Sequence, residues 1–405
     1  MATIFQFINY KPVVYSGFDK FNVLVAQKLR SQGHNLFFVF FDTLDEAPEL
    51  KEAIVRSQAD IIFLKSGQNI LARTIAIIKL LKQYKPEIVH VHFINQIKLL
   101  LACLRPFFRF QLFVSFHSKI WEGTMEEYKT RKGRIRYFFF KTYLYLLAVA
   151  SEKVFCVSEA TQKQYKAFVD RPNIANLHLG IERPHGTYSG ACKKLGFNPQ
   201  DATIRICNIG AIEYLKGLDV IVKALNILQG IPDLPPFQFC HIGGLRSQPA
   251  ETDLAFLQRI LLLQKEYRLE QVFHLLGKRE DIMEILPAFD IYVHPSRSEG
   301  LGMAIIEACA YRLPVICTNT GGMPEIVEGL EDCYLIEKED AEQLAEKLQK
   351  LIRKVYLGKN SLQHPLSSHS GTSYLSYEEW WQKFDIDLLT DKLINIYLNE
   401  KTKVQ

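Results

Sequence analysis

Short apolar runs alternate with longer segments of helical periodicity along the first part of the chain. Runs of four to seven apolar residues are typical of buried strands, and apolar residues that recur every three or four positions are typical of helices. The predicted strands cover residues 3–8, 35–41, 61–64, 87–92, 112–117 and 154–157. The predicted helices cover residues 19–32, 74–84 and 138–151. This alternation predicts a parallel, doubly wound α/β sheet.

A second alternation of the same kind follows an interruption that contains Pro184, Gly186 and Pro199, which indicates a linker. Its predicted strands cover 204–209, 237–242, 272–275 and 291–294, and its predicted helices cover 218–228, 282–286 and 340–355. The chain length suits two domains. The predicted boundaries are 1–185 for the first domain, 186–202 for the linker, 203–376 for the second domain and 377–405 for a C-terminal helix.

Composition places the chain among ordinary globular proteins, with 48% apolar and 23% charged residues. The N-terminal residues read as a buried strand, without the basic segment and cleavage site of a signal peptide. The eight cysteines form no C-x-x-C pair and several lie in apolar runs, which favours buried free thiols in a reducing compartment. No group of residues has metal-ligand spacing, so no metal site is predicted.

Charge is distributed unevenly along the chain. Residues 1–185 contain 26 Lys and Arg against 15 Asp and Glu, and the excess is concentrated in 98–147, where aromatic residues are interleaved. Basic and aromatic residues on one helix suit an anionic membrane surface, although Arg136 and Lys141 leave the apolar run too short to span a bilayer. The alternative is a core helix with a solvated basic face. Nucleic acid is not expected as a partner, because no recognised motif accompanies the charge.

The most informative segment is 296–328, SRSEGLGMAIIEACAYRLPVICTNTGGMPEIVE. Glu299 falls in a predicted loop, and Glu307 falls eight residues later in the predicted helix. Gly300 and Gly302 leave the backbone bare at the helix start, where free N–H groups and a partial positive charge suit a phosphate. One carboxylate before the helix, and another roughly 9 Å further along its axis, can take hydroxyls on both sides of that phosphate. The arrangement fits a nucleotide sugar: sugar, diphosphate, then ribose.

This segment resembles the E-x7-E signature of retaining glycosyltransferases with the GT-B fold, most closely those of family four. The matching residues are Glu299, Gly300, Gly302, Glu307, Pro314, Gly321, Gly322, Pro324, Glu325 and Val327. The resemblance implies two facing Rossmann-like domains and a last helix that packs back on the first domain, an element that the periodic segment 377–399 resembles. It also implies transfer without a metal, in which the leaving diphosphate helps to deprotonate the acceptor.

The same resemblance implies roles for individual residues. Glu299 holds hydroxyls of the donor sugar, and Glu307 holds the ribose. Gly17 is the remaining half of a Gly-Gly pair that approaches the donor diphosphate, Lys216 clamps that diphosphate, and His117, at the end of a predicted strand, lines the sugar site. The donor site is completed by the backbone at Gly300, Leu301 and Gly302 and by the turn that carries Arg279. The residues expected to act in catalysis are His117, Lys216 and Glu299.

The chain departs from the family pattern at Ala211. The family usually has an arginine at this position, five residues before the lysine that corresponds to Lys216. A methyl group cannot replace a bidentate guanidinium, and Arg246 and Arg297 are the candidates for supplying the missing cation. His90 and His92 also match a family feature and are interpreted as structural or acceptor-side residues.

Three functional hypotheses remain open at this stage. The first is a cytoplasmic transferase, peripherally bound to the membrane, that extends a lipid-linked glycan or a cell-surface polysaccharide or lipopolysaccharide. The second is a soluble transferase that makes a small glycoside. The third, motivated by Ala211, is a nucleotide-sugar-binding protein with impaired turnover. A dehydrogenase is disfavoured, because no G-x-G-x-x-G follows the first predicted strand.

Overall fold

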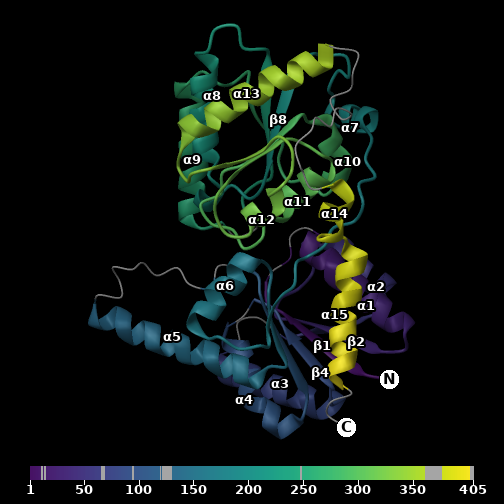
Figure 1. Ribbon diagram of the computed structural model, residues 1–405. Coiled ribbons are helices and arrows are strands. Elements are labelled where there is room, and N and C mark those ends of the chain that lie inside the picture. The colour runs from purple at the N-terminus through teal and green to yellow at the C-terminus, as the bar shows by residue number, and fades with distance from the viewer. Residues whose placement is uncertain are drawn as a thin grey trace. The chain divides into compact units, whose positions relative to one another are not determined.

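The computed structural model divides the chain into two compact units, each built on one parallel sheet. The first unit comprises Met1–Ile181 and Lys383–Gln405, and the second comprises Glu182–Gln382 (Figure 1). The described residues are 1–10, 12, 15–64, 69–93, 95–118, 120, 130–246, 249–360 and 376–401. Residues 119 and 121–129 of the basic, aromatic segment therefore lie outside the described part of the chain, as do residues 402–405 of the predicted C-terminal helix.

The first unit contains a seven-stranded sheet in the order β3-β2-β1-β4-β5-β6-β7. Its strands are β1 (Thr3–Ile8), β2 (Asn35–Phe40), β3 (Asp60–Phe63), β4 (Ile88–Val91), β5 (Gln111–Phe116), β6 (Lys153–Cys156) and β7 (Ile174–Asn176). All residues of β4 and β5 are buried, and both strands are mostly apolar, as is typical of the middle strands of a parallel sheet. The predicted doubly wound parallel sheet is confirmed, and only the three-residue β7 was not predicted.

Six helices connect these strands among the described residues of the first unit. They are α1 (Gly17–Ser31), α2 (Pro48–Arg56), α3 (Ile70–Tyr84), α4 (Asn95–Phe108), α5 (Arg131–Ala150) and α6 (Glu159–Phe168). The sequence predicted the helix at 138–151, but α5 begins seven residues earlier, because the Thr130 side chain accepts a hydrogen bond from the Gly133 amide and caps the helix. Helix α4 was not predicted, and it contains Pro106 in its interior.

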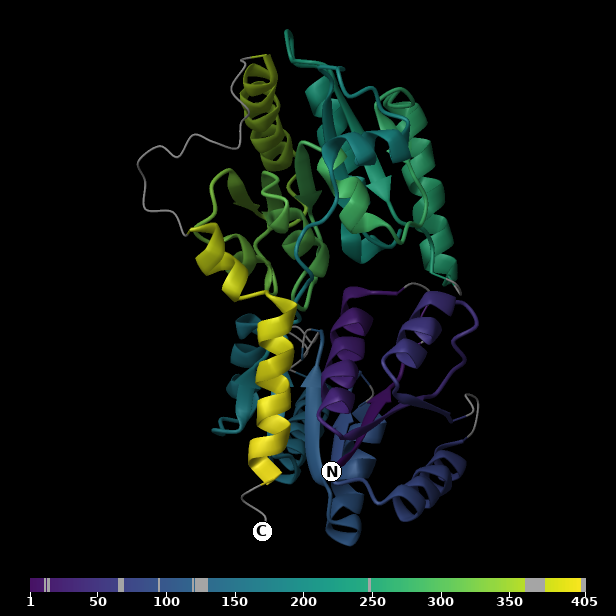
Figure 2. The same cartoon turned by 90° about the vertical axis from the view of Figure 1, so that its right-hand side faces the viewer.

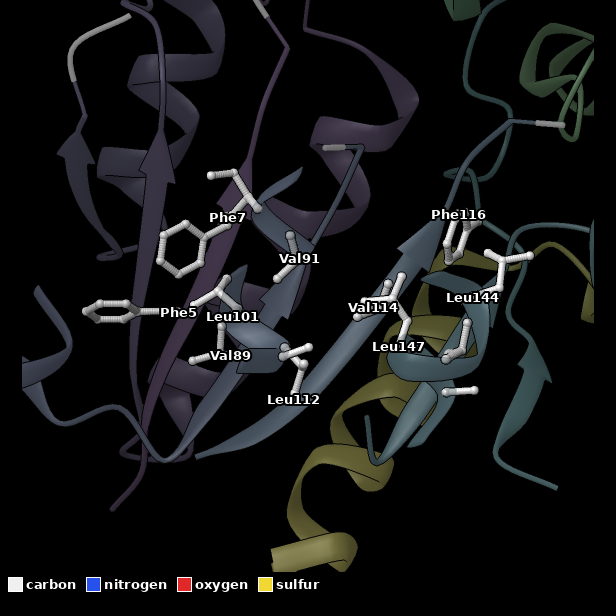
Figure 3. Close-up of a cluster of buried hydrophobic side chains, with 14 of the residues drawn as sticks. Phe5, Phe7, Val89, Val91, Leu101, Leu112, Val114, Phe116, Leu144 and Leu147 are labelled. Atoms are coloured by element: carbon white, nitrogen blue, oxygen red, sulfur yellow. The ribbon is translucent and has the colours of Figure 1, made fainter. Parts of the chain in front are cut away.

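Apolar side chains from the middle strands and two helices form the core of the first unit. Figure 3 shows side chains from β1, β4 and β5 packed with Leu101 of α4 and with Leu144 and Leu147 of α5. All three leucines are fully buried. Replacing one of them with alanine would cost roughly 2–5 kcal/mol through lost burial and a residual cavity. This core fixes the positions at which β1, β4 and β5 end.

The second unit contains a six-stranded parallel sheet in the order β10-β9-β8-β11-β12-β13. Its strands are β8 (Ile204–Ile209), β9 (Phe237–Ile242), β10 (Phe273–Leu275), β11 (Ile291–His294), β12 (Val315–Thr318) and β13 (Cys333–Ile336). Its helices include α8 (Leu218–Gln229), α9 (Glu251–Glu266), α10 (Ile282–Ile285), α11 (Met303–Ala310), α12 (Met323–Val327) and α13 (Ala341–Asn360), with 3-10 turns η2 (Tyr214–Lys216) and η3 (Leu286–Ala288). The strand order is that of a dinucleotide-binding Rossmann sheet, in which the direction of winding reverses between β8 and β11.

The segment predicted as a linker contains a helix, α7 (Tyr188–Leu195). The Thr187 side chain accepts a hydrogen bond from the Gly190 amide at its start, and Gly196 ends it in the left-handed region at φ 69°. Ala191 and Cys192 of α7 pack against Ala288 of η3. The proline and glycine residues therefore bound a short helix instead of marking irregular chain throughout.

The prediction of one continuous helix over 377–399 is wrong, because the segment forms α14 (Tyr377–Gln382) and α15 (Ile386–Lys401). Asp385 separates them: its carboxylate accepts hydrogen bonds from the amides of Asp387 and Leu388 and caps α15. Helix α15 contacts α1 (Figures 1 and 2), and Lys28 of α1 forms an ion pair with Asp391 at 2.8 Å. The expectation that the last helix packs on the first unit is confirmed.

Candidate active site

Ligands of open α/β sheets bind beyond the carboxyl ends of the strands, where the order of winding reverses. In the second unit this point lies between β8 and β11, which pair directly. The segment after β8 carries Ala211 and Lys216, and the segment after β11 carries Glu299. The structure thus brings Lys216 and Glu299 together at the reversal point, where open α/β sheets bind their ligands.

Glu299 is the centre of a buried polar cluster. Its Oε1 accepts hydrogen bonds from Lys216 Nζ at 2.5 Å, from His294 Nε2 at 2.9 Å and from Ser296 Oγ at 3.2 Å. The other ring nitrogen of His294 contacts Tyr292 Oη at 2.9 Å, which holds the imidazole in place. Within the described part of the chain, Oε2 of Glu299 has no hydrogen-bond partner. One oxygen of this carboxylate thus remains available to a ligand.

The electrostatics of this cluster keep Glu299 ionised. Burial raises the pKa of its carboxyl, but the positive charge of Lys216 and the hydrogen bond from His294 outweigh burial and lower the pKa to about 2. The Glu299 side chain is 14% exposed. A carboxylate held in this way can accept hydrogen bonds from sugar hydroxyls without taking up a proton near neutral pH.

Backbone geometry explains how Lys216 reaches Glu299. Gly217, at φ 69°, lies so close to β11 that an added Cβ would be 2.1 Å from the Pro295 carbonyl oxygen. Only glycine fits this left-handed turn at such close approach. The Lys216 stem passes beside Gly210, whose added Cβ would lie 3.6 Å from Lys216 Cγ. The glycines at the two ends of this loop therefore direct the lysine toward the carboxylate.

The glycine-rich turn after β12 supports Glu299 from the other side. Gly321 has φ 58°, and an added Cβ would lie 2.0 Å from the Glu299 carbonyl oxygen. The Gly322 amide donates a hydrogen bond to the Gly300 carbonyl at 3.1 Å. Through these contacts the turn at Gly321 and Gly322 supports the backbone of the loop that carries Glu299 and Gly300.

Helix α11 begins directly after this loop. Gly302 is its N-cap residue, in the left-handed region at φ 102°, and Leu301 before it is buried. Glu307 lies in the second turn of α11 and is half-buried. The predicted order of carboxylate, helix start and second carboxylate is thus present in the structure.

The two arginines considered as replacements for the missing cation at Ala211 have different surroundings. Arg297 is buried and forms two 2.9 Å hydrogen bonds to the Asp219 carboxylate, and it also pairs with Glu339. Arg246 follows β9, pairs with Glu213 and is more than half exposed. Releasing either arginine would leave a buried carboxylate, Asp219 or Glu213, unpaired, which is costly. The two arginines differ in exposure, since the Arg246 side chain is 58% exposed and that of Arg297 is 8% exposed.

The loops after β8, β9 and β10 are joined side by side by backbone hydrogen bonds. The Ile212 amide donates to the Gly244 carbonyl at 3.0 Å, and the Gly243 amide donates to the Gly277 carbonyl at 2.8 Å. Arg279, in the last of these loops, forms a bidentate ion pair with Asp281 at 2.8 and 2.7 Å. The Arg279 side chain is therefore anchored in its own turn.

In the first unit, Gly17 is the first residue of α1, directly after the segment that follows β1. Ser16 caps the helix, and the Ser16 amide donates to the Asp19 carboxylate at 3.0 Å in a capping box. Asp19 also accepts a hydrogen bond from Tyr10. Burial raises the pKa of Asp19 to about 6. This cap fixes the helix start at Gly17.

His117 follows β5 directly and pairs with a residue that the sequence did not link to it. Its Nε2 lies 3.0 Å from Nδ1 of His92, which follows β4. The His117 ring stacks on Phe93 at 4.5 Å. His90, two residues before His92, has both ring nitrogens engaged, with Ser115 Oγ at 2.7 Å and Tyr397 Oη at 2.5 Å. The structure thus separates a structural histidine, His90, from a pair at the strand ends.

Sequence reasoning missed His294 and Ser296 as neighbours of Glu299, and Lys98 as a neighbour of the histidine pair. The signal for His294 was present, because it ends a strand of the second sheet as His117 ends one of the first. Among the described residues, no group of three or more His, Cys, Asp or Glu side chains is arranged to hold a metal ion. All eight cysteines are free thiols, and Cys103 is exposed.

Comparison with known families decides the class of protein to which this site belongs. The family described as Glycosyl transferases group 1 matches residues 194–361, and Glycosyltransferase Family 4 matches residues 15–183. The chain belongs to the glycosyltransferases of group 1 and family 4. The resemblance of the E-x7-E block to retaining GT-B enzymes is thereby confirmed, and the two matches together cover most of the chain.

Individual relatives agree with this assignment. The chain is 29% identical over 230 residues to an uncharacterized glycosyltransferase of Methanocaldococcus jannaschii, a match that spans 56% of this chain and 55% of the relative. It is 27% identical over 260 residues to a GDP-mannose-dependent monoacylated alpha-(1-6)-phosphatidylinositol monomannoside mannosyltransferase of Corynebacterium glutamicum, over 60% of this chain and 61% of that protein. The chain thus aligns with little more than half the length of these relatives.

A solved structure of Anabaena HepE in complex with UDP-glucose resembles the whole fold. Its TM-score to this structure is 0.72 at 16% identity, and the match covers 98% of this chain and 99% of that protein. At this identity the likeness shows the fold, which is GT-B.

Proposed function

We propose that the chain is a retaining glycosyltransferase that moves a sugar from a nucleoside-diphosphate sugar to a glycan or lipid-linked acceptor. The observation that carries the proposal is the Lys216–Glu299–His294 cluster at the reversal point of the second sheet. It stands beside a bare helix start and a second carboxylate, Glu307, on the same helix. The place that we propose for this reaction is the synthesis of a cell-surface polysaccharide or lipopolysaccharide.

Each part of the donor has a matching group in the second unit. The Oε2 atom of Glu299 accepts hydrogen bonds from donor-sugar hydroxyls. Lys216 and the amides at Leu301 and Gly302 receive the diphosphate, since a helix start with free N–H groups favours an anion. Glu307 takes the ribose hydroxyls, and Gly300 lets the backbone approach. The backbone of the turn before Arg279 meets the base.

The Lys216–Glu299 ion pair suggests how donor binding and charge stabilisation are linked. In the ligand-free protein Lys216 neutralises Glu299, so neither charge is left buried alone. When a diphosphate arrives, Lys216 can share its three N–H groups between carboxylate and phosphate. As the bond to the leaving diphosphate breaks, the positive charge and the helix start stabilise the developing negative charge. The sugar is held by Glu299 throughout, which keeps the reacting centre in place.

For the first unit we propose roles for two residues, Gly17 as a backbone contact of a diphosphate and His117 as a contact of a sugar. Burial and the nearby charges of Lys98 and His90 lower the pKa of His117 well below its ordinary value. The neutral imidazole can therefore accept and donate hydrogen bonds without adding a full charge.

The alternative function is nucleotide-sugar binding with impaired turnover, which Ala211 favours because one cation of the expected clamp is missing. We infer that Arg246 supplies that cation, since it lies on the loop bonded to the segment after Ala211 and its side chain is mostly exposed. A soluble transferase that makes a small glycoside is a further alternative, distinguished by its acceptor.

Attachment to an anionic membrane surface is part of the proposal and rests on α5. The buried residues of this helix, Leu144, Leu147 and Ala148, all lie in its C-terminal part. Its N-terminal part exposes Phe138 and Phe139 by 65% and 66%, with exposed basic residues Arg131, Lys132, Arg134 and Lys141 around them. Each basic residue near an anionic surface contributes roughly 1 kcal/mol. None of the helices that the structure describes is long and apolar enough to cross a bilayer.

A panel of UDP-, GDP-, ADP- and CMP-sugars tests the proposal directly. The full chain is incubated with each compound, and release of the nucleotide and transfer to added glycan and lipid-linked acceptors are measured. Turnover with one nucleotide class supports a transferase. A thermal shift with one class but no turnover under any condition would favour the binding protein instead.

A further inference from the structure

A group of basic side chains gathers at the ends of β4 and β5 without any described acidic partner. His92 follows β4, Lys98 lies in the first turns of α4, and His117 follows β5. These three residues are referred to as the strand-end basic cluster. They belong to one unit and lie on three adjacent elements, so the geometry of the cluster is set by the fold of that unit alone.

Lys98 is the least expected member of this cluster. Its side chain is 1% exposed, and Nζ lies 3.8 Å above the ring centroid of Phe116, the last residue of β5. Among the described residues Lys98 has no ion-pair partner. A lysine is almost never fully buried unless it is paired, and the attraction of one ring does not replace a carboxylate.

The two histidines leave hydrogen-bonding groups unused. Their contact joins Nδ1 of His92 to Nε2 of His117, so each ring has one nitrogen left. Both of these, Nε2 of His92 and Nδ1 of His117, are buried and have no partner in the described structure. His92 is 3% exposed. Buried polar atoms without partners need an explanation, and a ligand that supplies the partners is one.

The titration of the cluster agrees with this interpretation. Burial lowers the pKa of Lys98 to about 7, and burial with repulsion among the basic groups lowers the pKa of His92 and His117 well below the ordinary range. The buried carboxylate in the first turn of α1, Asp19, already accepts hydrogen bonds from Tyr10 and Ser16. An anion that enters the cluster would therefore offset the positive charge of Lys98 and accept a hydrogen bond from the one N–H that the histidine pair leaves unused.

We propose that the strand-end basic cluster binds a phosphate group carried by the acceptor substrate. Phosphate suits this set, because its oxygens can accept hydrogen bonds from the Lys98 ammonium and from His92 Nε2–H. In this tautomer His117 Nε2–H donates to His92 Nδ1, and His117 Nδ1 stays free to accept from a donor-sugar hydroxyl. The donor's own phosphates already have Lys216 and the start of α11 in the second unit. That the phosphate belongs to an acceptor rests on the proposed function. Phosphate binding by the cluster does not depend on that function.

The test measures phosphate binding by the full chain through its melting temperature. Wild type, Lys98→Met, and the exposed-lysine control Lys51→Met are titrated with inorganic phosphate against sodium chloride of equal ionic strength. We expect phosphate to raise the melting temperature of wild type and of Lys51→Met. We expect Lys98→Met to bind phosphate about tenfold more weakly or worse, since a charge-assisted hydrogen bond is lost. A full phosphate response in Lys98→Met, or none in wild type, would overturn the proposal.

A second variant separates this cluster from the donor site. Lys216→Met should keep the phosphate response, and loss of the response in Lys216→Met with its retention in Lys98→Met would assign phosphate to the donor site and refute the inference. Should Lys98→Met fail to fold, ring signals of His92 and His117 in 13C-histidine-labelled wild type serve as the readout. They should shift with phosphate, and unchanged signals would contradict the proposal.

Two phosphate esters distinguish the sources of the ligand. Glycerol 3-phosphate and farnesyl phosphate share the phosphate and differ in the lipid tail, so stronger binding of the second supports a lipid-linked acceptor and equal binding supports a sugar or polyol phosphate. Nucleotide-sugar turnover is measured in the same preparations. If no nucleotide sugar binds or reacts while the Lys98-dependent response persists, the proposed function fails and phosphate binding stands. If turnover occurs and the phosphate response is absent, the inference alone fails.

Discussion

Lys216 Nζ lies 2.5 Å from Glu299 Oε1, although 83 residues separate them in the chain. The pair forms at the reversal point of the second sheet, where Gly217 and Gly321 allow the two segments to approach their neighbours closely. It fixes the lysine that we assign to the diphosphate and the carboxylate that we assign to the sugar in one cluster. The stability of the unit and the proposed chemistry therefore depend on the same two side chains.

Replacing only one partner of this pair should be more damaging than replacing both. Lys216→Met leaves a buried carboxylate without its counter-charge, and we expect a loss on the order of 3 kcal/mol in the free energy of unfolding. Lys216→Met combined with Glu299→Gln should recover a large part of that loss. Urea denaturation of the two single variants and the double variant measures the coupling, and simple additivity of the two single effects would show that the pair is not coupled.

The stability contributed by Glu299 should depend on pH in a defined window. Its pKa is about 2 in the folded protein against an ordinary value of 4.5, so the folded state binds fewer protons than the unfolded state between these values. The contribution, roughly 3 kcal/mol, is therefore present above pH 4.5 and is lost as the pH falls toward 2. Urea denaturation of wild type and Glu299→Gln from pH 6 to pH 2.5 should show a stability difference that shrinks with acidity. A constant difference would contradict the assigned pKa.

Gly321→Ala should disturb the site through the backbone. The added methyl carbon would lie 2.0 Å from the Glu299 carbonyl oxygen at a φ of 58°, so the loop that carries Glu299 must move. We expect a loss of several kcal/mol in stability and weaker donor binding. Gly33→Ala is a matched control, because Gly33 also has positive φ, at 81°, but an added Cβ meets nothing within 4 Å. Its cost should stay near 1 kcal/mol, and equal effects of both variants would refute the argument from close approach.

Arg246→Met should lower turnover if Arg246 replaces the cation missing at Ala211. We expect a loss of about tenfold or more in kcat/KM for the nucleotide sugar, the size of one charge-assisted contact. Adding Ala211→Arg to that variant should restore turnover by returning a guanidinium to the family position. Arg259→Met, an exposed arginine on α9, should be neutral. If Arg246→Met turns over at the wild-type rate, the substitute must come from elsewhere.

Membrane attachment through α5 should depend on its exposed aromatic residues. We expect Phe138→Ser combined with Phe139→Ser to reduce sedimentation with anionic liposomes at low salt several-fold. The reason is that the variant has no aromatic rings at these positions to insert into the apolar part of the membrane interface. Leu262→Ser, at a residue of α9 that is exposed to a similar extent, is the control and should sediment like wild type. Sedimentation of the double variant at wild-type levels, or no sedimentation of wild type, would remove α5 from the account.

The sequence predicted the architecture well, because apolar periodicity reports burial directly. The buried strands β4 and β5 are mostly apolar, with His90 in β4 and Gln111 and Ser115 in β5. The alternation of strands with helices was sufficient for the two parallel sheets. Helix α6 was missed because most of its residues are polar and only Thr161 and Tyr165 are buried. The break at Asp385 was missed because periodicity continues across it, and only the capping role of its carboxylate reveals it.

The site could be predicted only in part. Glu299, Lys216 and the glycines were found through a motif, because a turn with positive φ and close approach requires glycine at fixed spacing. The contact between His92 and His117, and the position of Lys98 over Phe116, depend on which strands are adjacent in the sheet. The order β1-β4-β5 brings these residues together, and no local pattern in a single sequence records that order.

A crystal structure of the full chain with a bound nucleoside-diphosphate sugar tests the central claim most directly. The account predicts the diphosphate between Lys216 Nζ and the amides at Leu301 and Gly302, with the sugar on Glu299 and the ribose on Glu307. A donor bound away from the ends of β8 and β11, with Lys216 and Glu299 still paired and untouched, would contradict it.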